Sequence, residues 1–169
     1  MDIGLILIGP RFYQHQYLPQ PPTMLTIAGS DSCGGAGIQA DMKTATVLGV
    51  FSSSCITAVT SQNTQGVKLV ELVSENSLRT QLKCVCEDIT LGAVKIGMTG
   101  SRENVKIIAE AIKQYHLSNV VFDPVMAASS GQLLSKGDLC ACFKENLIPL
   151  CDLITPNLPE VRKICYINE

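Results

Sequence analysis

The chain lacks a strong excess of charge of either sign, and this absence removes one class of partner. It contains 13 Lys and Arg against 15 Asp and Glu, a formal net charge of −2. The basic residues are scattered along the sequence rather than clustered, so no positive field would attract a phosphate backbone. Nucleic acid is therefore not an expected partner.

A hydrophobic run long enough to cross a membrane, about 20 residues, is also missing. The apolar run 3–8 is short, Asp2 precedes it, and three prolines close the segment by position 22. An organelle transit peptide is an alternative, but this segment is poor in Arg and Ser. We expect residues 1–23 to form an irregular N-terminal extension, with no membrane partner and a cytoplasmic location.

No Cys-x-x-Cys pair occurs among the eight cysteines. Cys84 and Cys86 are two positions apart, as are Cys140 and Cys142, and in a helix this spacing turns the side chains to different faces. Such pairs do not suit one metal ion. Because several cysteines lie in apolar runs, we expect reduced thiols in the core rather than disulfides or a zinc site.

What the sequence does contain is an alternation of apolar runs and helical periodicity, which is typical of a parallel sheet built from βα units. With 169 residues and 46% apolar content, the chain can bury one core. The predicted strands are 24–28, 54–60, 69–73, 93–97, 120–123 and 153–154, and the predicted helices are 37–48, 77–87, 102–115 and 139–147. Ligands bind at the carboxyl ends of strands in open α/β sheets. The residues expected at that edge are Gly29, Ser61, Gln62, Met98, Asp123 and Thr155.

The segment 28–41 passes from an apolar strand through four glycines into a helix start, a turn at which a ligand can approach bare backbone. The Lys and Ser/Thr of a P-loop are missing, and no acid follows at the distance of a dinucleotide fingerprint. We therefore expect no nucleotide at this turn, and a helix start without any ligand is an alternative. Asp41 lies one turn into the helix, where it either reaches back toward the turn or faces solvent.

Polar side chains follow three other strands. Gln62 offers a donor and an acceptor side by side, which matches the edge of an aminopyrimidine, although polar residues after a strand are mostly turn formers. Asp123 ends an apolar strand on a carboxylate, which suits a metal or a nucleotide phosphate. Asn157 and Glu160 are three apart at a helix start. They suit either Mg²⁺ with phosphates or a helix cap, and spacing alone favours the cap.

Several separated blocks, in order along the chain, resemble the hydroxymethylpyrimidine and phosphomethylpyrimidine kinases of thiamine biosynthesis, members of the ribokinase-like superfamily. The blocks are 25–31 with 34–41, then 56–64, 95–98, 123–126 and 154–160. The resemblance covers about residues 24–160. It implies an α/β, ribokinase-like three-layer fold with a mostly parallel central sheet, truncated at the C-terminus. Residues 24–169 would then be the N-terminal part of the kinase domain.

The resemblance also implies an activity: the γ-phosphoryl group of ATP passes to the hydroxymethyl oxygen of the pyrimidine, and then to its monophosphate. Gln62 would bind the polar edge of the pyrimidine, with Met98 and Val125 over the ring faces. Asn157 and Glu160 would bind the nucleotide cofactor, and Asp123 and Glu160 the Mg²⁺ ion. The full set implied for the pyrimidine is Gly29, Asp41, Thr60, Gln62, Met98 and Val125.

One departure from the family is large. The family's late Gly-Thr-Gly-Cys segment supplies the anion hole and the catalytic residue, and it occurs nowhere in this chain. No catalytic residue can be assigned, and we expect little or no turnover by this chain alone. A sheet edge and apolar helix faces left uncovered would predict poor solubility or a covering partner.

Two other functions stay open. Pyridoxal or pyridoxine kinase shares the superfamily, although Met98 and Gln62 favour the pyrimidine. A non-catalytic pyrimidine-binding or dimerisation module is the alternative from another class. Complete relatives form dimers through small strands, so the resemblance implies a homodimer with residues 62–73 at its interface.

Overall fold

The structure is a computed structural model that describes residues 20–126 and 139–165. Its strands are β1 (Thr23–Asp31), β2 (Phe51–Asn63), β3 (Gly66–Leu72), β4 (Ala93–Ile96), β5 (Val120–Phe122) and β6 (Leu153–Ile154). The helices are α1 (Gly37–Val47), α2 (Glu75–Asp88), α3 (Arg102–Gln114), the short α4 (Cys140–Cys142) and α5 (Leu158–Cys165). The part of the predicted extension up to residue 19 lies outside the described residues, and β1 begins at Thr23.

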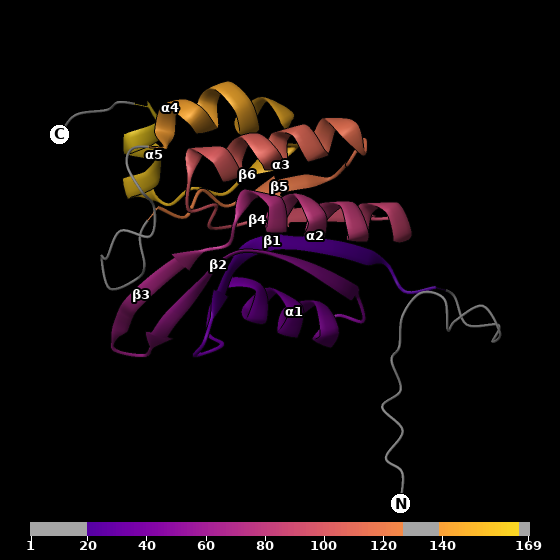
Figure 1. The fold of residues 1–169 in the computed structure, drawn as a ribbon, viewed down its shortest axis with the longest axis horizontal. Helices are drawn as coiled ribbons and strands as arrows, with labels where there is room; N and C mark the ends of the chain where they lie inside the picture. Colours follow the sequence, from indigo (N-terminus) through magenta and orange to yellow (C-terminus); the bar gives the residue numbers. More distant parts are fainter. Residues whose placement is uncertain (1–19, 127–138, 166–169) are drawn as a thin grey trace, which may run out of the picture.

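These strands form one sheet in the order β3-β2-β1-β4-β5-β6. All neighbours are parallel except β2 and β3, which form an antiparallel hairpin. Figure 1 shows α1 on one face of the sheet and α2 and α3 on the opposite face. The predicted three-layer α/β architecture with a mostly parallel sheet is confirmed.

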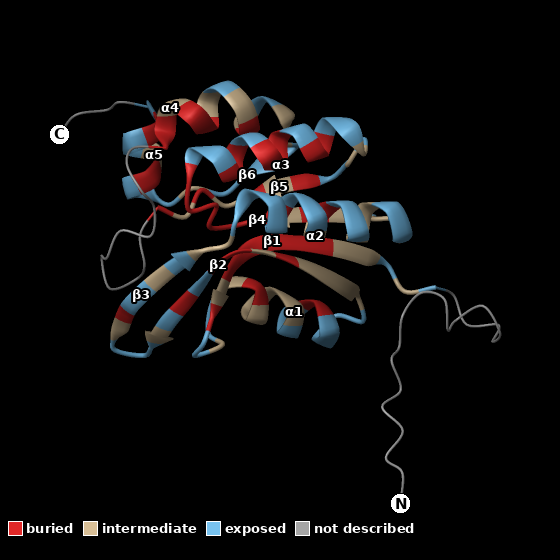
Figure 2. Cartoon of the chain, in the orientation of Figure 1, coloured by how far each residue is buried: buried red, intermediate tan, exposed pale blue. Residues whose placement is uncertain are grey.

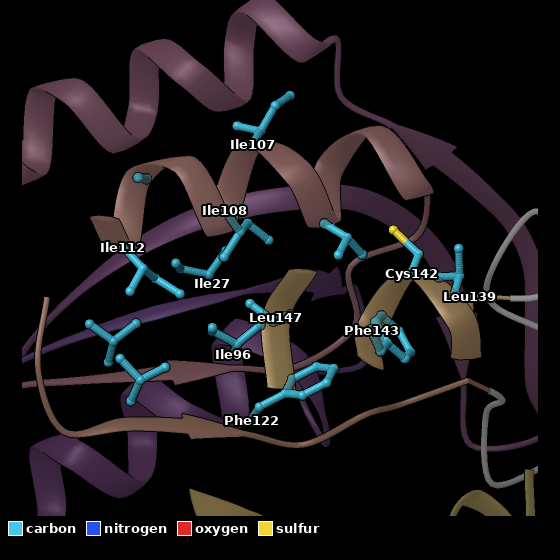
Figure 3. Packing of buried hydrophobic residues seen from close by; sticks show 14 of the residues in the cluster. Ile27, Ile96, Ile107, Ile108, Ile112, Phe122, Leu139, Cys142, Phe143 and Leu147 are labelled. Carbon is cyan, nitrogen blue, oxygen red and sulfur yellow. The ribbon is translucent and has the colours of Figure 1, made fainter. Parts of the chain in front are cut away.

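Successive side chains along the central strands point to opposite faces of the sheet, and this alternation explains how the layers pack. In β1, Leu25 and Ile27 are fully buried and belong to the main core, whereas Thr26 between them reaches Asp41 of α1. The same core includes the apolar face of α3, and Figure 2 shows buried residues in both the sheet and this helix. In Figure 3, Phe122 of β5 lies beside Phe143, with ring centroids 5.0 Å apart in an edge-to-face arrangement. One face of the central sheet therefore builds the core, and the other is available for polar groups.

Several predicted elements need correction. The strand predicted at 54–60 spans Phe51–Asn63, so Ser61 and Gln62 lie within β2 and not after it. The strand predicted to end at residue 28 continues to Asp31, because Ser30 and Asp31 still pair with β2 beyond an irregularity in the register. The helix predicted at 139–147 is not one regular helix: α4 passes into a π-helical turn (Phe143–Leu147) and a 3₁₀ turn (Ile148–Leu150). Pro149 lies in that last turn and cannot donate a backbone hydrogen bond, so a regular helix cannot continue through it.

The cysteines are only partly in the core. All eight are free. Cys55, Cys140 and Cys142 are buried, but Cys33, Cys84 and Cys165 are exposed, so the core interpretation is wrong for these last three. No described helix combines the length and the apolar character needed to span a membrane.

Candidate active site

A cleft of about 580 Å³ opens at the carboxyl ends of the central strands. The residues on its wall come from the glycine-rich turn, the β2–β3 hairpin, the segments after β4 and β5, and the start of α5. Nine predicted site residues line it: Gly29, Asp41, Thr60, Gln62, Met98, Asp123, Val125, Asn157 and Glu160. Ser61 and Thr155, also expected at this edge, are not among the lining residues. The sheet thus brings together side chains that are far apart in the sequence, whereas their roles stay predictions.

The glycine-rich turn is organised by a carboxylate to which the sequence analysis assigned no role. Asp31 is buried, and its two oxygens accept hydrogen bonds from the backbone N–H groups of Cys33, Gly35 and Ala36 at 2.8, 3.0 and 2.9 Å. These N–H groups are already used within the protein, so they are not open to a phosphate. The expectation that no nucleotide binds at this turn stays a prediction.

Gly37 allows α1 to start against β1. Its φ of +59° is left-handed, and a Cβ here would lie 2.2 Å from the carbonyl oxygen of Gly29. The side chain of Gln39 ties the same elements together, because it accepts from the N–H of Asp31 at 2.8 Å and donates to the hydroxyl of Ser30 at 2.7 Å. The turn is therefore fastened to the strand on which the cleft is built.

Asp41 lies in neither of the two positions that we expected for it. Its carboxylate points toward the sheet, where both oxygens accept from the Lys95 ammonium at 3.0 Å, and Oδ2 also accepts from the Thr26 hydroxyl at 2.6 Å. The sequence analysis assigned no role to Lys95. The available signal was a single charged residue inside the otherwise apolar strand β4, but its partner lies 54 residues away.

Gln62 is held by its backbone. The hydroxyl of Ser32 accepts from the N–H of Gln62 and donates to its carbonyl oxygen, both at 2.8 Å. The hydroxyl of Thr60 lies 3.0 Å from the Ser30 carbonyl oxygen and 3.4 Å from Oε1 of Gln62. These contacts join the glycine-rich turn to the hairpin and leave the Gln62 side chain on the wall of the cleft.

Asp123 follows β5, and its N–H donates to the carbonyl oxygen of Ile96 at 2.8 Å, which extends the pairing with β4. Burial raises the pKa of its carboxyl group, while Lys95 lowers it and Asp41 raises it. Within residues 20–126 and 139–165, no hydrogen-bond donor contacts this carboxylate. Asp123 is thus an acid in the cleft whose oxygens are available to a cation.

Asn157 and Glu160 form a cap at the start of α5. The N–H of Asn157 donates to Glu160 Oε2 at 2.9 Å, and the N–H of Glu160 donates to Asn157 Oδ1 at 3.0 Å. The capping alternative is therefore correct for these two atoms. Both residues also line the cleft, and Oε1 of Glu160 has no part in the cap, so the cap does not exclude a second role.

Mg²⁺ prefers oxygen ligands and is commonly held by one or two carboxylates together with substrate phosphates. The described residues contain no group of three His, Cys, Asp or Glu side chains that could hold a metal alone. The carboxylate oxygens of Asp123 and the Oε1 atom of Glu160 fit the arrangement in which only one or two carboxylates hold the ion. Water molecules or phosphate oxygens would complete the coordination of a cation here.

The similarity of the chain to known proteins assigns it to a family. A family model described as phosphomethylpyrimidine kinase matches residues 31–169. The chain belongs to the phosphomethylpyrimidine kinase family. The ribokinase-like fold and the family resemblance are thereby confirmed.

Individual relatives support the assignment of the chain to the phosphomethylpyrimidine kinase family. The hydroxymethylpyrimidine/phosphomethylpyrimidine kinase of Rhizobium meliloti is 50% identical over 136 residues, which are 80% of this chain and 51% of that protein. The crystal structure of phosphomethylpyrimidine kinase from Clostridium difficile has 47% identity and a TM-score of 0.81, covering 88% of this chain and 64% of the other. Bacillus subtilis pyridoxal kinase, solved as an ADP complex, has 34% identity and a TM-score of 0.76, with 88% and 55% covered.

The chain is short beside its relatives. It spans about half or less of the length of the curated relatives that it matches. What the comparisons establish is therefore the family and the fold of this part.

Proposed function

We propose that this chain forms the pyrimidine-binding part of a kinase that phosphorylates 4-amino-5-hydroxymethyl-2-methylpyrimidine and its monophosphate with ATP. The observation that carries this proposal is the single cleft lined by residues from all the family-like blocks. Its wall combines an amide, a thioether and a valine with several carboxylates. Such a mixture suits a flat polar ring that must be held beside a phosphoryl donor.

Gln62 would recognise the ring through its amide, which can donate to a ring nitrogen while accepting from the exocyclic amine. Met98 supplies apolar contact: it is buried, and its sulfur lies close to the place where a Cβ on Gly29 would be. Val125 supplies a second apolar contact in the cleft. These groups would fix the ring so that its hydroxymethyl group points toward Asp123.

ATP and Mg²⁺ are the cofactors of this proposal, with Asp123 and Glu160 as cation ligands and Asn157 beside the phosphates. The cation would neutralise charge on the phosphates during in-line transfer. The residues of this chain would position the acceptor and hold the cation. The segment for the anion hole is not assigned, because no Gly-Thr-Gly-Cys occurs among these residues.

Calorimetry and mass spectrometry on the full chain test the proposal. We expect the pyrimidine to bind, and Gln62→Ala to weaken binding about 10- to 100-fold, the cost of a lost pair of buried hydrogen bonds. Incubation with ATP, Mg²⁺ and either the pyrimidine or pyridoxine then reports transfer. A folded sample that does not bind the pyrimidine contradicts the proposal.

The transfer experiment separates the remaining functions. Pyrimidine phosphate as the product supports the kinase, and preferred phosphorylation of pyridoxine would favour a pyridoxal kinase. Tight pyrimidine binding without product would favour a binding module. Competition between the two substrates in the calorimeter gives an independent measure of preference.

We also propose a homodimer through the outer face of the hairpin. Pairing of β2 with β3 puts Val59, Ser61, Leu69 and Glu71 on one face. Val59 and Leu69 are 52% and 55% exposed there, two large apolar side chains on a strand pair beside the cleft. Light scattering after gel filtration should give twice the chain mass, and Leu69→Lys should shift the chain to monomer. A wild-type monomer at all concentrations would contradict this proposal.

We also propose that the chain is located in the cytoplasm. Eight free thiols, three of them exposed, suit a reducing compartment. Cell fractionation with an antibody against the chain is the test, and enrichment in an organelle fraction would contradict it.

A further inference from the structure

Two carboxylates of the cleft, Asp41 and Asp123, interact electrostatically with the same ammonium group, that of Lys95. Lys95 pairs in register with Thr26 of β1, and a Cβ on Gly97 would lie 3.1 Å from its Nζ. The ammonium group therefore lies over the end of β4, on the face that also carries Asp41. Asp123 follows the neighbouring strand, where its N–H donates to the carbonyl oxygen of Ile96, the residue before Gly97. Burial raises the pKa of the Asp123 carboxyl group, and the ammonium group of Lys95 offsets part of this rise.

The ammonium group is not shared equally. Lys95 contacts both oxygens of Asp41 at 3.0 Å, and the side chains of this pair are only 27% and 17% exposed, respectively. Thr26 donates to Oδ2 of the same carboxylate. The carboxylate of Asp123 receives no hydrogen bond from the described residues, so its interaction with Lys95 is a weaker electrostatic one.

Asp41 keeps one acceptor position for a ligand. A carboxylate can accept about four hydrogen bonds, and the contacts with Lys95 and Thr26 occupy three. The remaining position is on Oδ1, and Asp41 lines the cleft. A metal ion would have to compete with an ammonium group that already covers both oxygens, whereas an O–H or N–H donor needs only one free lone pair.

We propose that Lys95 assigns the two carboxylates to different ligands, holding Asp41 as an acceptor for an O–H or N–H group of the pyrimidine and leaving Asp123 for the metal cation. This inference rests on the proposed function for the identity of the substrate. Lys95 is thus a positioning residue that acts through Asp41. Without it, two carboxylates with no counter-charge would face the same cation.

The test measures two ligands on the full chain: 4-amino-5-hydroxymethyl-2-methylpyrimidine by calorimetry and Mn²⁺ alone by electron paramagnetic resonance. For Lys95→Met we expect pyrimidine affinity to fall about tenfold or more, because Asp41 loses its charged partner. We expect Mn²⁺ to bind about tenfold more tightly, because one positive charge beside Asp123 is gone. Lys95→Arg should keep both affinities near the wild type, and Lys83→Met, on the exposed face of α2, is the matched control.

Affinity changes in opposite directions support the inference, because a loss of structure would weaken the binding of both ligands. A parallel loss, no change in either, or no Mn²⁺ binding by any variant overturns it. If Lys95→Met does not fold, Lys95→Gln keeps an N–H donor without the charge and should give a smaller fall in pyrimidine affinity with the same gain in Mn²⁺ affinity. Wild-type chain that binds no pyrimidine overturns the proposed function instead, and the Mn²⁺ comparison still judges Lys95.

Discussion

The backbone at Gly37 lies closer to a neighbouring strand than a side chain would permit, and this contact is testable. Gly37→Ala should destabilise the fold by about 2–5 kcal/mol, because a left-handed residue with a Cβ adds strain and overpacking. The Cβ would lie 2.2 Å from a backbone oxygen that cannot rotate away. Urea unfolding measures the change.

Gly49 provides the control for this substitution. Its φ of +72° is similarly left-handed, but a Cβ there would meet nothing within 4 Å. Gly49→Ala should cost only the backbone strain, about 1–2 kcal/mol. Equal costs at the two positions would show that the approach of α1 to β1 is not tight.

Cys55 should make stability fall at alkaline pH. Burial, with smaller contributions from Cys86 and Cys84, raises the pKa of its thiol from 9.0 to about 12. The raised pKa favours folding fully below pH 9, and this contribution is lost as pH rises toward 12, because the unfolded chain ionises first. At pH 10 the loss is about 1.4 kcal/mol relative to pH 8 or below.

Unfolding free energies of the wild type and Cys55→Ala at pH 8 and pH 10 give the measurement. The variant is destabilised at both values by its cavity, so the difference between the two pH values is compared. We expect a smaller fall in the variant. Identical falls would mean that the thiol ionises as readily in the folded chain as in the unfolded one.

The start of α5 can serve the helix and a ligand together. Glu160→Gln keeps an oxygen that can cap Asn157, so we expect a change in unfolding free energy within about 1 kcal/mol, whereas Glu160→Ala should cost about 1–2 kcal/mol. Both variants remove the carboxylate and should weaken Mn²⁺ binding. If Glu160→Gln binds Mn²⁺ like the wild type, Glu160 is only a cap.

At the scale of the whole molecule, we expect the exposed edge of the sheet at β6 to lower the solubility of the protein. β6 is the last strand of the sheet within the described residues, and its Leu153 and Ile154 are 54% and 37% exposed. Leu158, which starts α5, is 75% exposed. An apolar edge strand with unpaired backbone groups invites association with other chains.

We expect Leu153→Lys to raise the concentration at which the chain begins to aggregate, measured by dynamic light scattering. Val47→Lys at the end of α1 is the matched control, since Val47 is 87% exposed but lies on a helix. The control should have little effect. Equal effects of the two substitutions would show that general surface charge, rather than the edge strand, limits solubility.

The sequence by itself determined the order of elements, the parallel sheet, the family, and the residues that follow β4, β5 and β6. These follow from local periodicity and from motifs that can be read over a few positions. Spacing alone favoured the cap for Asn157 and Glu160, and the structure confirms that cap. The same spacing also suits a ligand, so the sequence could not decide whether these side chains have a second use.

Only the tertiary structure decided what Asp41 faces and what organises the glycine-rich turn. The pairing of Asp41 with Lys95 spans 54 residues, and it depends on the register between β1 and β4 and on how α1 lies over them. Likewise, Asp31 became the acceptor for the turn because β1 continues past Gly29. Such contacts depend on how separate elements pack, so no local pattern in the chain could specify them.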